Sequence, residues 1–392
     1  MARDEASEDA IERARGLGPL LREAAVSIEA RRELTPEVVE ALHDARMFRL
    51  LLPKSLGGDE LDLKTHAAVI EVISSFDAST AWCMGQGAGC AMAAAFLDQE
   101  AAQRLFGPRE AVLAWGAGIQ GRAIAVEGGY RVTGKWAFAS GSRHATLLGG
   151  HSYLYDTAGQ PLMAADGRHL DRTMLFARDK ATIDDNWFVM GLCGTGSDSY
   201  AVEDLFVPAA DTVDRDNLAE CREPGALFKC STSLAYGVSF AAVQLGLARA
   251  MLDELRAIAM TKTPRGATSS LRESPVFQTE LARLEASYRA QRAYLHSAAD
   301  TAFRQAGTAA GLSIGDRSAL KLATVHVINE CVEVITGAYR AAGATAIFPR
   351  QPFERRLRDA LTASQQVQGR VQNYLTAGRC LLDLEPDTTM FL

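Results

Sequence analysis

The chain has 392 residues, of which 48% are hydrophobic and 23% charged, and its formal net charge is −7. This composition is typical of a globular protein, and the length predicts more than one packed unit. The acidic balance, without any Lys/Arg-rich block, argues against nucleic acid or an anionic membrane surface as a partner.

The N-terminal residues are acidic and polar, so we expect no secretory signal. The longest apolar stretches fall short of the roughly 20 residues that a membrane span needs. The seven cysteines are odd in number and include no CxxC pair, which indicates free thiols in a reducing compartment. We therefore expect a cytoplasmic protein. The histidines form no HxxxH or His/Cys cluster, so the sequence gives no support for a metal site.

Residues 5 to about 110 show helical periodicity. Thr35 followed by Pro36 predicts a helix start, because a hydroxyl cap precedes a proline that loses no amide bond there. Further helices are expected over 63–74 and from about residue 79. The latter is rich in Ala and Gly over 82–96, a surface that another backbone or a flat ligand can approach closely.

Strand-like runs alternate with glycine turns between about 111 and 210. Two adjacent glycines, Gly128 and Gly129, predict a hairpin turn between two such runs. This part of the chain is therefore expected to form a compact β domain.

Helical periodicity returns from about residue 225. The segment 234–258 is apolar nearly all round, which predicts a helix buried in a bundle or at a subunit contact. Long helices are expected over 275–309, over 315–340 with Asp316 as its cap, and over 353–381. The chain is thus expected to divide into a helical domain (1–110), a β domain (111–224) and a helical bundle (225–392).

Four segments carry a family resemblance in the right order and spacing: LPKSLGG (52–58), FDASTAW (76–82), GGYRVTGKWAFASGSRHA (128–145) and GLCGTGSDSYAVEDLFVPA (191–209). By these motifs the chain resembles the acyl-CoA dehydrogenase superfamily. The resemblance implies an α+β fold with an N-terminal helical domain, a central β-barrel-like domain and a C-terminal four-helix bundle. It also implies a homotetramer.

Within that superfamily, FASGSRHA and GTGS look most like the two-component (group D) flavin-dependent monooxygenases, such as the oxygenases of 4-hydroxyphenylacetate and dibenzothiophene metabolism. This resemblance implies that the chain takes reduced flavin (FADH2 or FMNH2) from a separate NAD(P)H-flavin reductase. With molecular oxygen it would oxygenate a small aromatic or heteroaromatic substrate through a C4a-hydroperoxyflavin. The resemblance does not choose between FAD and FMN.

Trp136, Phe138 and Ser140 are expected to share one face of a strand, where two rings and a hydroxyl suit an isoalloxazine. The resemblance places Ser140 where a hydroxyl meets flavin N5. A plain β-domain core is the alternative reading of Trp136 and Phe138. By the same resemblance, further cofactor contacts are expected from Gly141, Thr195, Gly196, Ser197 and, for the phosphate, Arg358. Substrate contacts are expected from Trp82, His144 and Tyr236.

The last helix lacks the acid that a thioester dehydrogenase uses as its base. The segment 358–370 holds no carboxylate after Asp359, and the alternative base position falls near Tyr236. Gln366 stands where the resemblance implies a histidine, and glutamine donates a hydrogen bond but cannot act as a base. Ser140 and Gln366 are therefore the expected catalytic residues. The alternatives are a dehydrogenase with an atypical base such as Tyr236, and a flavin-binding relative without turnover.

Overall fold

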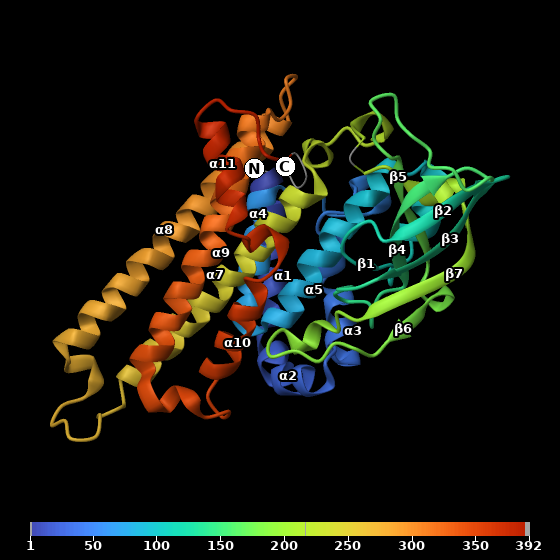
Figure 1. Cartoon of the computed structure of the whole chain (residues 1–392). Helices are drawn as coiled ribbons and strands as arrows, with labels where there is room; N and C mark the ends of the chain where they lie inside the picture. Colours follow the sequence, from blue (N-terminus) through green and yellow to red (C-terminus); the bar gives the residue numbers. More distant parts are fainter. Residues whose placement is uncertain (1, 216, 389–392) are drawn as a thin grey trace.

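The computed structural model describes residues 2–215 and 217–388. Helices from both ends of the chain lie together beside one β sheet (Figure 1). The N-terminal helices are α1 (Ala2–Gly16), α2 (Gly18–Arg31), α3 (Pro36–Asp44), α4 (Leu63–Phe76), α5 (Ala78–Ala91) and α6 (Gln99–Phe106). The C-terminal helices are α7 (Thr232–Ala259), α8 (Pro275–Ala306), α9 (Ile314–Ala342), α10 (Phe353–Ala363) and α11 (Gln372–Leu381). This order of helical, β and helical segments agrees with the prediction.

The sheet contains β1 (Leu113–Trp115), β2 (Gly121–Val126), β3 (Gly129–Trp136), β4 (Leu147–Tyr155), β5 (Asp171–Ala177), β6 (Thr182–Asp184), β7 (Ser199–Pro208) and β8 (Thr212–Val213). Its strand order is β6-β7-β3-β2-β4-β5-β8, with β1 paired to β4. Strands β1 and β2 run parallel to β4, and the other pairs are antiparallel. In the described chain β6 and β8 are the two edges, so the expected barrel-like domain is an open, mixed sheet.

Strand β4 is the longest of the strands that the sequence did not reveal. Its residues LLGGHSYLY contain two adjacent glycines, and from the sequence alone such a pair predicts a turn and not a strand. The structure shows why they are needed. A Cβ atom on Gly150 would lie 2.7 Å from the Trp136 ring, and one on Gly149 would lie 2.9 Å from the Trp115 ring. The glycines make room for two buried indoles.

Local capping interactions set the helix starts. The Thr35 hydroxyl accepts from the Val38 amide at 3.4 Å, as expected. Helix α5 is capped by Asp77, whose carboxylate accepts from the Thr80 amide at 2.7 Å. The prediction that Asp316 caps α9 is wrong, because Ser313 is the N-cap. Asp316 is the third helical residue: its amide donates to the Ser313 hydroxyl, and its carboxylate accepts from the Ser313 amide.

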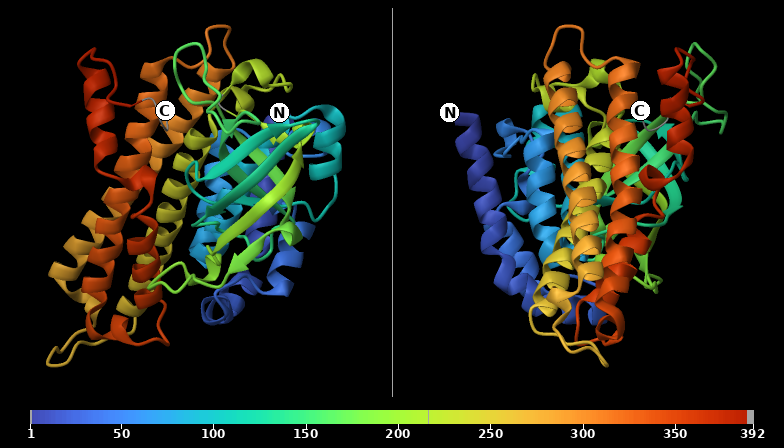
Figure 2. Two further views of the ribbon diagram at one scale, coloured as in Figure 1. Left: turned by 45° about the vertical axis from the view of Figure 1, so that its right-hand side comes forward. Right: turned by 90° about the vertical axis from the view of Figure 1, so that its left-hand side faces the viewer.

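The helices share one core around α7. Among the described helices α7 is the one long and apolar enough to cross a membrane, yet 94% of its most apolar window is buried inside the protein. Helices α4 and α5 cover it from the N-terminal side, and α8, α9 and α10 from the C-terminal side. Figure 2 shows these two sets lying side by side along the same bundle. One hydrophobic cluster runs through both sets, while the sheet has its own.

The predicted helix over 353–381 is interrupted. Helix α10 ends at Ala363, a short 3-10 turn covers Val367–Gly369, and α11 begins at Gln372. Asn373 donates to the Val367 and Gln368 carbonyls, and Asn329 donates to the Gly369 carbonyl. Two side-chain amides therefore replace the lost helical bonds and hold this loop, which we call the 364–371 loop, in place.

A buried carboxylate ties α4 to α8. Glu71 accepts from Tyr288 at 2.7 Å, from Arg292 at 2.8 Å and from His296 at 3.2 Å. Burial opposes ionisation of Glu71, but the bonds from His296, Arg292 and Tyr288 outweigh it, so the pKa of Glu71 is lowered. The ionised Glu71 carboxylate thus holds α4 and α8 together.

Glu71→Gln is expected to lower the free energy of unfolding at pH 7 by about 3 kcal/mol, because it removes one partner of a buried ion pair. A lowered folded pKa gives stability above the ordinary pKa of 4.5 that disappears as the pH falls through the folded value. The difference between the two proteins in urea unfolding should therefore shrink below pH 4.5. The exposed, unpaired Glu23→Gln is the matched control; equal effects of the two substitutions would contradict this role.

Candidate functional site

A chain of hydrogen-bonded side chains crosses the contact between α5 and the β domain. Trp82 Nε1 donates to Ser140 Oγ at 3.0 Å, and Ser140 Oγ lies 2.7 Å from Ser197 Oγ. Ser197 Oγ lies 2.7 Å from Thr195 Oγ1, which donates to the Leu192 carbonyl at 2.9 Å. Three of the predicted cofactor residues and one predicted substrate residue are thereby brought together. We call them the hydroxyl chain.

The direction of the hydroxyl chain follows from counting hydrogens. Each hydroxyl has one hydrogen. Thr195 gives its hydrogen to the Leu192 carbonyl, so it accepts from Ser197; Ser197 in turn accepts from Ser140. Ser140 also accepts the Trp82 N–H. Ser140 is thus left with one free acceptor lone pair and no free hydrogen, which suits a ligand that presents an N–H.

Two glycines, Gly141 and Gly196, hold together the two segments that carry the hydroxyls of the chain. The Gly141 amide donates to the Thr195 carbonyl at 2.9 Å, and Gly141 has a φ of +83° that favours glycine. The Gly196 carbonyl accepts from Ser142 at 3.0 Å. An ion pair of 2.6 Å between Arg143 and the buried Asp198 fixes the same contact. Both predicted glycines position the hydroxyls through the backbone.

A stack of three aromatic rings continues from Trp82 into the bundle. The Trp82 ring lies 3.9 Å from that of Phe240, and the Phe240 ring lies 5.6 Å and nearly parallel to that of Tyr236. The small residues of α5 permit this approach, since a Cβ atom on Gly89 would lie 2.3 Å from Tyr236. Phe240 was not among the predicted site residues, although its position four residues after Tyr236 places both on one helix face.

The Tyr236 hydroxyl is held in its protonated form. Burial, and secondarily Cys90, raises the pKa of Tyr236 well above its ordinary value. Its hydroxyl lies 3.2 Å from Cys90 Sγ and accepts from Gln86 Nε2 at 3.1 Å. The atypical-base alternative therefore loses its candidate residue.

The expectation that Trp136, Phe138 and Ser140 share a strand face is wrong, because β3 ends at Trp136. Trp136 is fully buried in the sheet core, donates to the His151 carbonyl at 2.9 Å and stacks on Tyr200. The alternative reading, core packing, holds for this residue. Phe138 is 65% exposed and has a φ of +63°, a strained backbone for a bulky side chain. It stands at the surface two residues before Ser140.

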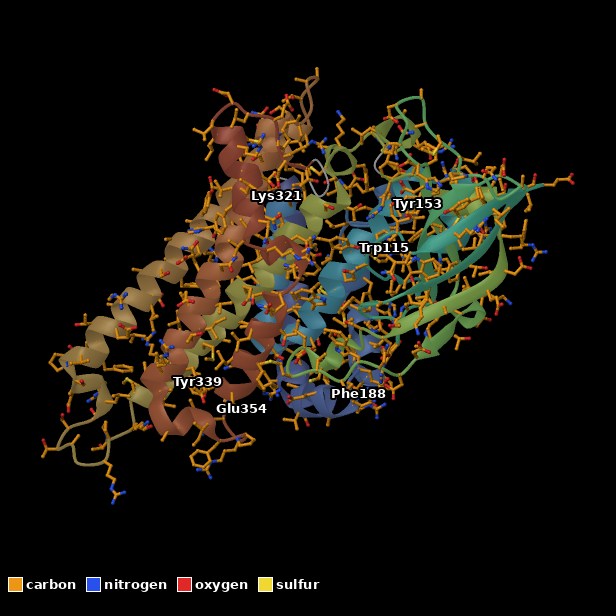
Figure 3. All side chains as sticks on the ribbon, viewed as in Figure 1. Trp115, Tyr153, Phe188, Lys321, Tyr339 and Glu354 are labelled. Carbon is orange, nitrogen blue, oxygen red and sulfur yellow. The ribbon has the colours of Figure 1, made fainter. Side chains whose placement is uncertain are left out.

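Arg358 and Asp359 fasten α10 to the loop that precedes the hydroxyl chain. Arg358 pairs with Glu29 and Glu354 and donates to the Met190 carbonyl at 2.7 Å. Figure 3 shows Glu354 at this end of the bundle. The guanidinium is thus committed to protein groups, which does not support the expected phosphate contact. Asp359 accepts from the Leu192 amide at 2.6 Å.

Burial raises the pKa of Asp359 to about 7, and the neighbouring Asp77 adds to the shift. This shift was not predictable from local sequence, because it depends on how two segments 167 positions apart meet. Asp359 bonds a backbone amide, so we interpret it as part of the fastener between α10 and the 190–196 loop.

Gln366 lies in the 364–371 loop and not within a helix, which corrects its predicted setting. Its Oε1 accepts from the Gln368 amide at 2.6 Å. Its Nε2 is buried, and no partner for it exists within residues 2–215 and 217–388. Thr362 Oγ1, four residues earlier, is orphaned in the same way. Buried donors without partners indicate a missing ligand or solvent.

His144 packs under the N-terminal helices, 5.4 Å from the Phe48 ring. Burial, then His43 and Arg178, lowers the pKa of His144 to about 4, so the ring is neutral at physiological pH. Its Nε2 also has no partner in the described part of the chain. The expected contact of His144 with substrate stays a prediction.

Two family models match the chain. The acyl-CoA dehydrogenase N-terminal domain matches residues 18–108, and the acyl-CoA dehydrogenase C-terminal domain matches residues 238–368. The chain therefore belongs to the acyl-CoA dehydrogenase family, which confirms the predicted family and α+β fold.

Relatives define the branch. The chain is 28% identical to indole-3-acetate monooxygenase of Pseudomonas putida, over 91% of this chain and 90% of that protein. It is 27% identical to the flavin-dependent monooxygenase oxygenase subunit HsaA of Rhodococcus jostii (strain RHA1), over 89% and 92%. The solved structure of XiaF from Streptomyces sp. with FADH2 and glycerol superposes with a TM-score of 0.91 at 25% identity, covering 99% and 98% of the two chains. The predicted enzyme class, a flavin-dependent oxidoreductase of the monooxygenase branch, is confirmed.

Asp359→Asn is expected to make the melting temperature less sensitive to pH between 5 and 8. A folded pKa of about 7, above the ordinary 3.8, means that wild-type stability decreases as the pH rises between these values. Asparagine stays neutral and still accepts from the Leu192 amide. The exposed Asp179→Asn serves as the control. Parallel pH profiles for wild type and Asp359→Asn would contradict the raised pKa.

Proposed function

We propose that this chain is the oxygenase component of a two-component flavin-dependent monooxygenase acting on a small aromatic or heteroaromatic compound. The observation that carries the proposal is the free acceptor lone pair of Ser140 at the end of the hydroxyl chain. A reduced isoalloxazine has an N–H at N5, whereas an oxidised one has only a lone pair there. The polarity of the hydroxyl chain therefore favours reduced flavin.

The polar groups of the site fit a flavin, because Ser140 can accept a hydrogen bond and Gln366 Nε2 can donate one. We propose that Phe138 and Ser140 meet the isoalloxazine, with Gly141, Thr195, Gly196 and Ser197 holding Ser140 in register. A bound reduced flavin would supply the electrons that activate molecular oxygen. The orphaned Gln366 Nε2 is suited to donate a hydrogen bond to an oxygen-bearing group. FAD and FMN remain equal candidates, because both carry the same ring.

The aromatic stack suits an aromatic substrate. Trp82, Phe240 and Tyr236 are each less than a tenth exposed and stack on one another. We propose that this stack forms one wall of the substrate site. Relatives of the chain are named for indole-3-acetate and resorcinol, both aromatic. We propose that the wall orients such a ring and excludes water from it.

The assembly and the reductase also belong to the proposal. We propose a cytoplasmic homotetramer supplied by a separate NAD(P)H-flavin reductase, with domain boundaries at 110 and 224. Large apolar side chains of α11 and of the residues that flank it on both sides are more than half exposed, which supports a subunit contact there; they are Val371, Leu375, Leu381 and Leu382.

The proposal predicts product from an aromatic panel (indole, indole-3-acetate, resorcinol) only when reductase, NAD(P)H, flavin and oxygen are all present. The reason is that neither expected base position carries an acid: the segment 358–370 has no carboxylate after Asp359, and the alternative position is Tyr236. The measurement is chromatography of the reaction with each component omitted in turn. Product under anaerobic conditions, or bleaching of oxidised flavin by an acyl thioester, would refute it.

Ser140→Ala is expected to weaken reduced-flavin binding about tenfold, which corresponds to about 1.4 kcal/mol for one lost hydrogen bond in a buried site. Anaerobic fluorescence titration measures this. Ser269→Ala, at an exposed position between α7 and α8, should bind as wild type does. Unchanged affinity in Ser140→Ala would remove Ser140 from the flavin site.

A further inference from the structure

Arg215 is an arginine whose guanidinium group lies against a buried indole ring. It follows β8 in the chain, and its guanidinium carbon is 5.1 Å from the centre of the Trp115 ring. Trp115, on β1, is only 3% exposed. In the part of the chain that the structure describes, no hydrogen bond or ion pair joins Arg215 to another residue. An arginine that lies on a buried ring and has no acidic partner is suited to bind an anion.

The charge of Arg215 acts on the interior of the protein. Burial lowers the pKa of His151 well below its ordinary value, and the Arg215 charge adds to this shift. The His151 ring lies 5.0 Å from the Trp115 ring, edge to face. Burial raises the pKa of both Tyr236 and Cys90, and Arg215 is among the groups that act in the opposite direction. The guanidinium group therefore influences three buried side chains, one of which belongs to the aromatic stack.

Trp115 connects Arg215 to the aromatic stack. Helix α5 packs on β1, and Figure 3 shows Trp115 where the helices meet the sheet. Cys90, on α5, has its Sγ 3.2 Å from the Tyr236 hydroxyl. Trp115 interacts with both of these groups and lowers both pKa values, which burial raises. The stack that begins at Tyr236 ends at Trp82, which donates to the hydroxyl chain. A line of rings thus runs from the hydroxyl chain to Arg215.

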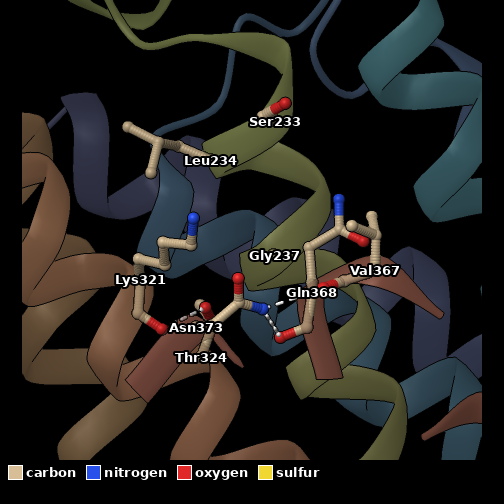
Figure 4. A pocket seen from close by; sticks show the side chains of 8 residues that line it. All are labelled: Ser233, Leu234, Gly237, Lys321, Thr324, Val367, Gln368 and Asn373. Carbon is tan, nitrogen blue, oxygen red and sulfur yellow. Dashed lines mark hydrogen bonds between the residues drawn. The ribbon is translucent and has the colours of Figure 1, made fainter. Parts of the chain in front are cut away.

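A small pocket on another face of α7 does not serve this purpose. It lies between α7 and α9, and Lys321 is one of the residues that line it (Figure 4). Its volume of about 10 Å³ admits about one water molecule. Gly237 borders this pocket and lies against Thr324 of α9, whereas Tyr236, one residue earlier, lies against α5. The pocket is therefore separate from the aromatic stack.

We propose that Arg215 binds the carboxylate of an aromatic acid substrate whose ring lies along the aromatic stack. The inference rests on the proposed function and names its substrate class. Arginine presents a planar fork of N–H donors that pairs with both oxygens of a carboxylate. Arg215 is half-buried on the segment between β8 and α7, so its guanidinium group is open to an incoming anion. It is thus a specificity-determining residue, because an acid is bound through both its ring and its charge, and a neutral aromatic through its ring alone.

The test compares indole-3-acetate with its neutral isostere indole-3-acetamide, titrated anaerobically into the full-length protein with reduced flavin. In Arg215→Gln, the Kd for the acetate should rise about 10- to 100-fold, as expected for lost hydrogen bonds between charged groups. The acetamide Kd should change less than about threefold. Arg215→Lys keeps the charge but loses the planar fork, so it should weaken the acetate by an intermediate factor of about three- to tenfold.

Arg122→Gln is the matched control. Arg122 also lies over an aromatic ring, 4.3 Å from the centre of that of Tyr155, but it is exposed on β2. Both probes should bind to this variant as they bind to wild type. If Arg215 only stabilises the fold through its contact with Trp115, Arg215→Gln should lower the melting temperature and weaken both probes equally. That result would overturn the inference.

Probe binding, turnover, reduced-flavin affinity and melting temperature are measured separately. If acetate binding depends on Arg215 but no aromatic compound is oxygenated, the anion site stands and the proposed function fails. If aromatics are oxygenated but Arg215→Gln affects both probes equally, the function stands and the inference is overturned. Loss of reduced-flavin affinity with unchanged acetate binding would also overturn it, since the guanidinium group would then bind the flavin. Should Arg215→Gln not fold, Arg215→Lys decides by the same comparison.

Discussion

The structure depends on the burial of one helix. Helix α7 is apolar nearly all round, so its surface is removed from water only if other helices surround it. Neither end of the chain supplies enough cover alone: α4 and α5 come from before the sheet, and α8, α9 and α10 from after it. The β domain is therefore inserted into a single helical body, and its position against α5 follows from how that body closes.

The candidate site lies where this closure brings unlike elements together. Helix α5 contributes Trp82, the sheet turns contribute Ser140 and Ser197, and α7 contributes the rings that extend the stack. The bond between Asp359 and the Leu192 amide joins α10 to the same loop. A Cβ atom on Gly191 would lie 2.1 Å from the Arg358 carbonyl, so that joint leaves no room for a larger residue. The direction of the hydrogen bonds in the hydroxyl chain therefore depends on these contacts between elements staying in place.

Much of the fold was predictable from local signals. The Thr35 cap, the glycine hairpin and the all-round apolarity of 234–258 each act over a few residues, and the structure agrees with them. Strand β4 and the interrupted last helix were not predictable, because both depend on distant residues. Gly150 is needed to make room for the Trp136 ring, and the loop carbonyls accept hydrogen bonds from Asn329 and Asn373. The candidate site was likewise predictable only in part. Ser140, Thr195 and Ser197 were found through motifs, whereas the burial of Trp136 and the raised pKa of Asp359 arise only from tertiary contacts.

Central to the account is that Ser140 offers a lone pair and no hydrogen to whatever lies against it. The most direct measurement is an anaerobic equilibrium titration of the wild-type protein with the same flavin in its two redox states. We expect the reduced form to bind at least about tenfold more tightly, the equivalent of one well-made hydrogen bond. Equal affinity, or tighter binding of the oxidised form, would contradict it.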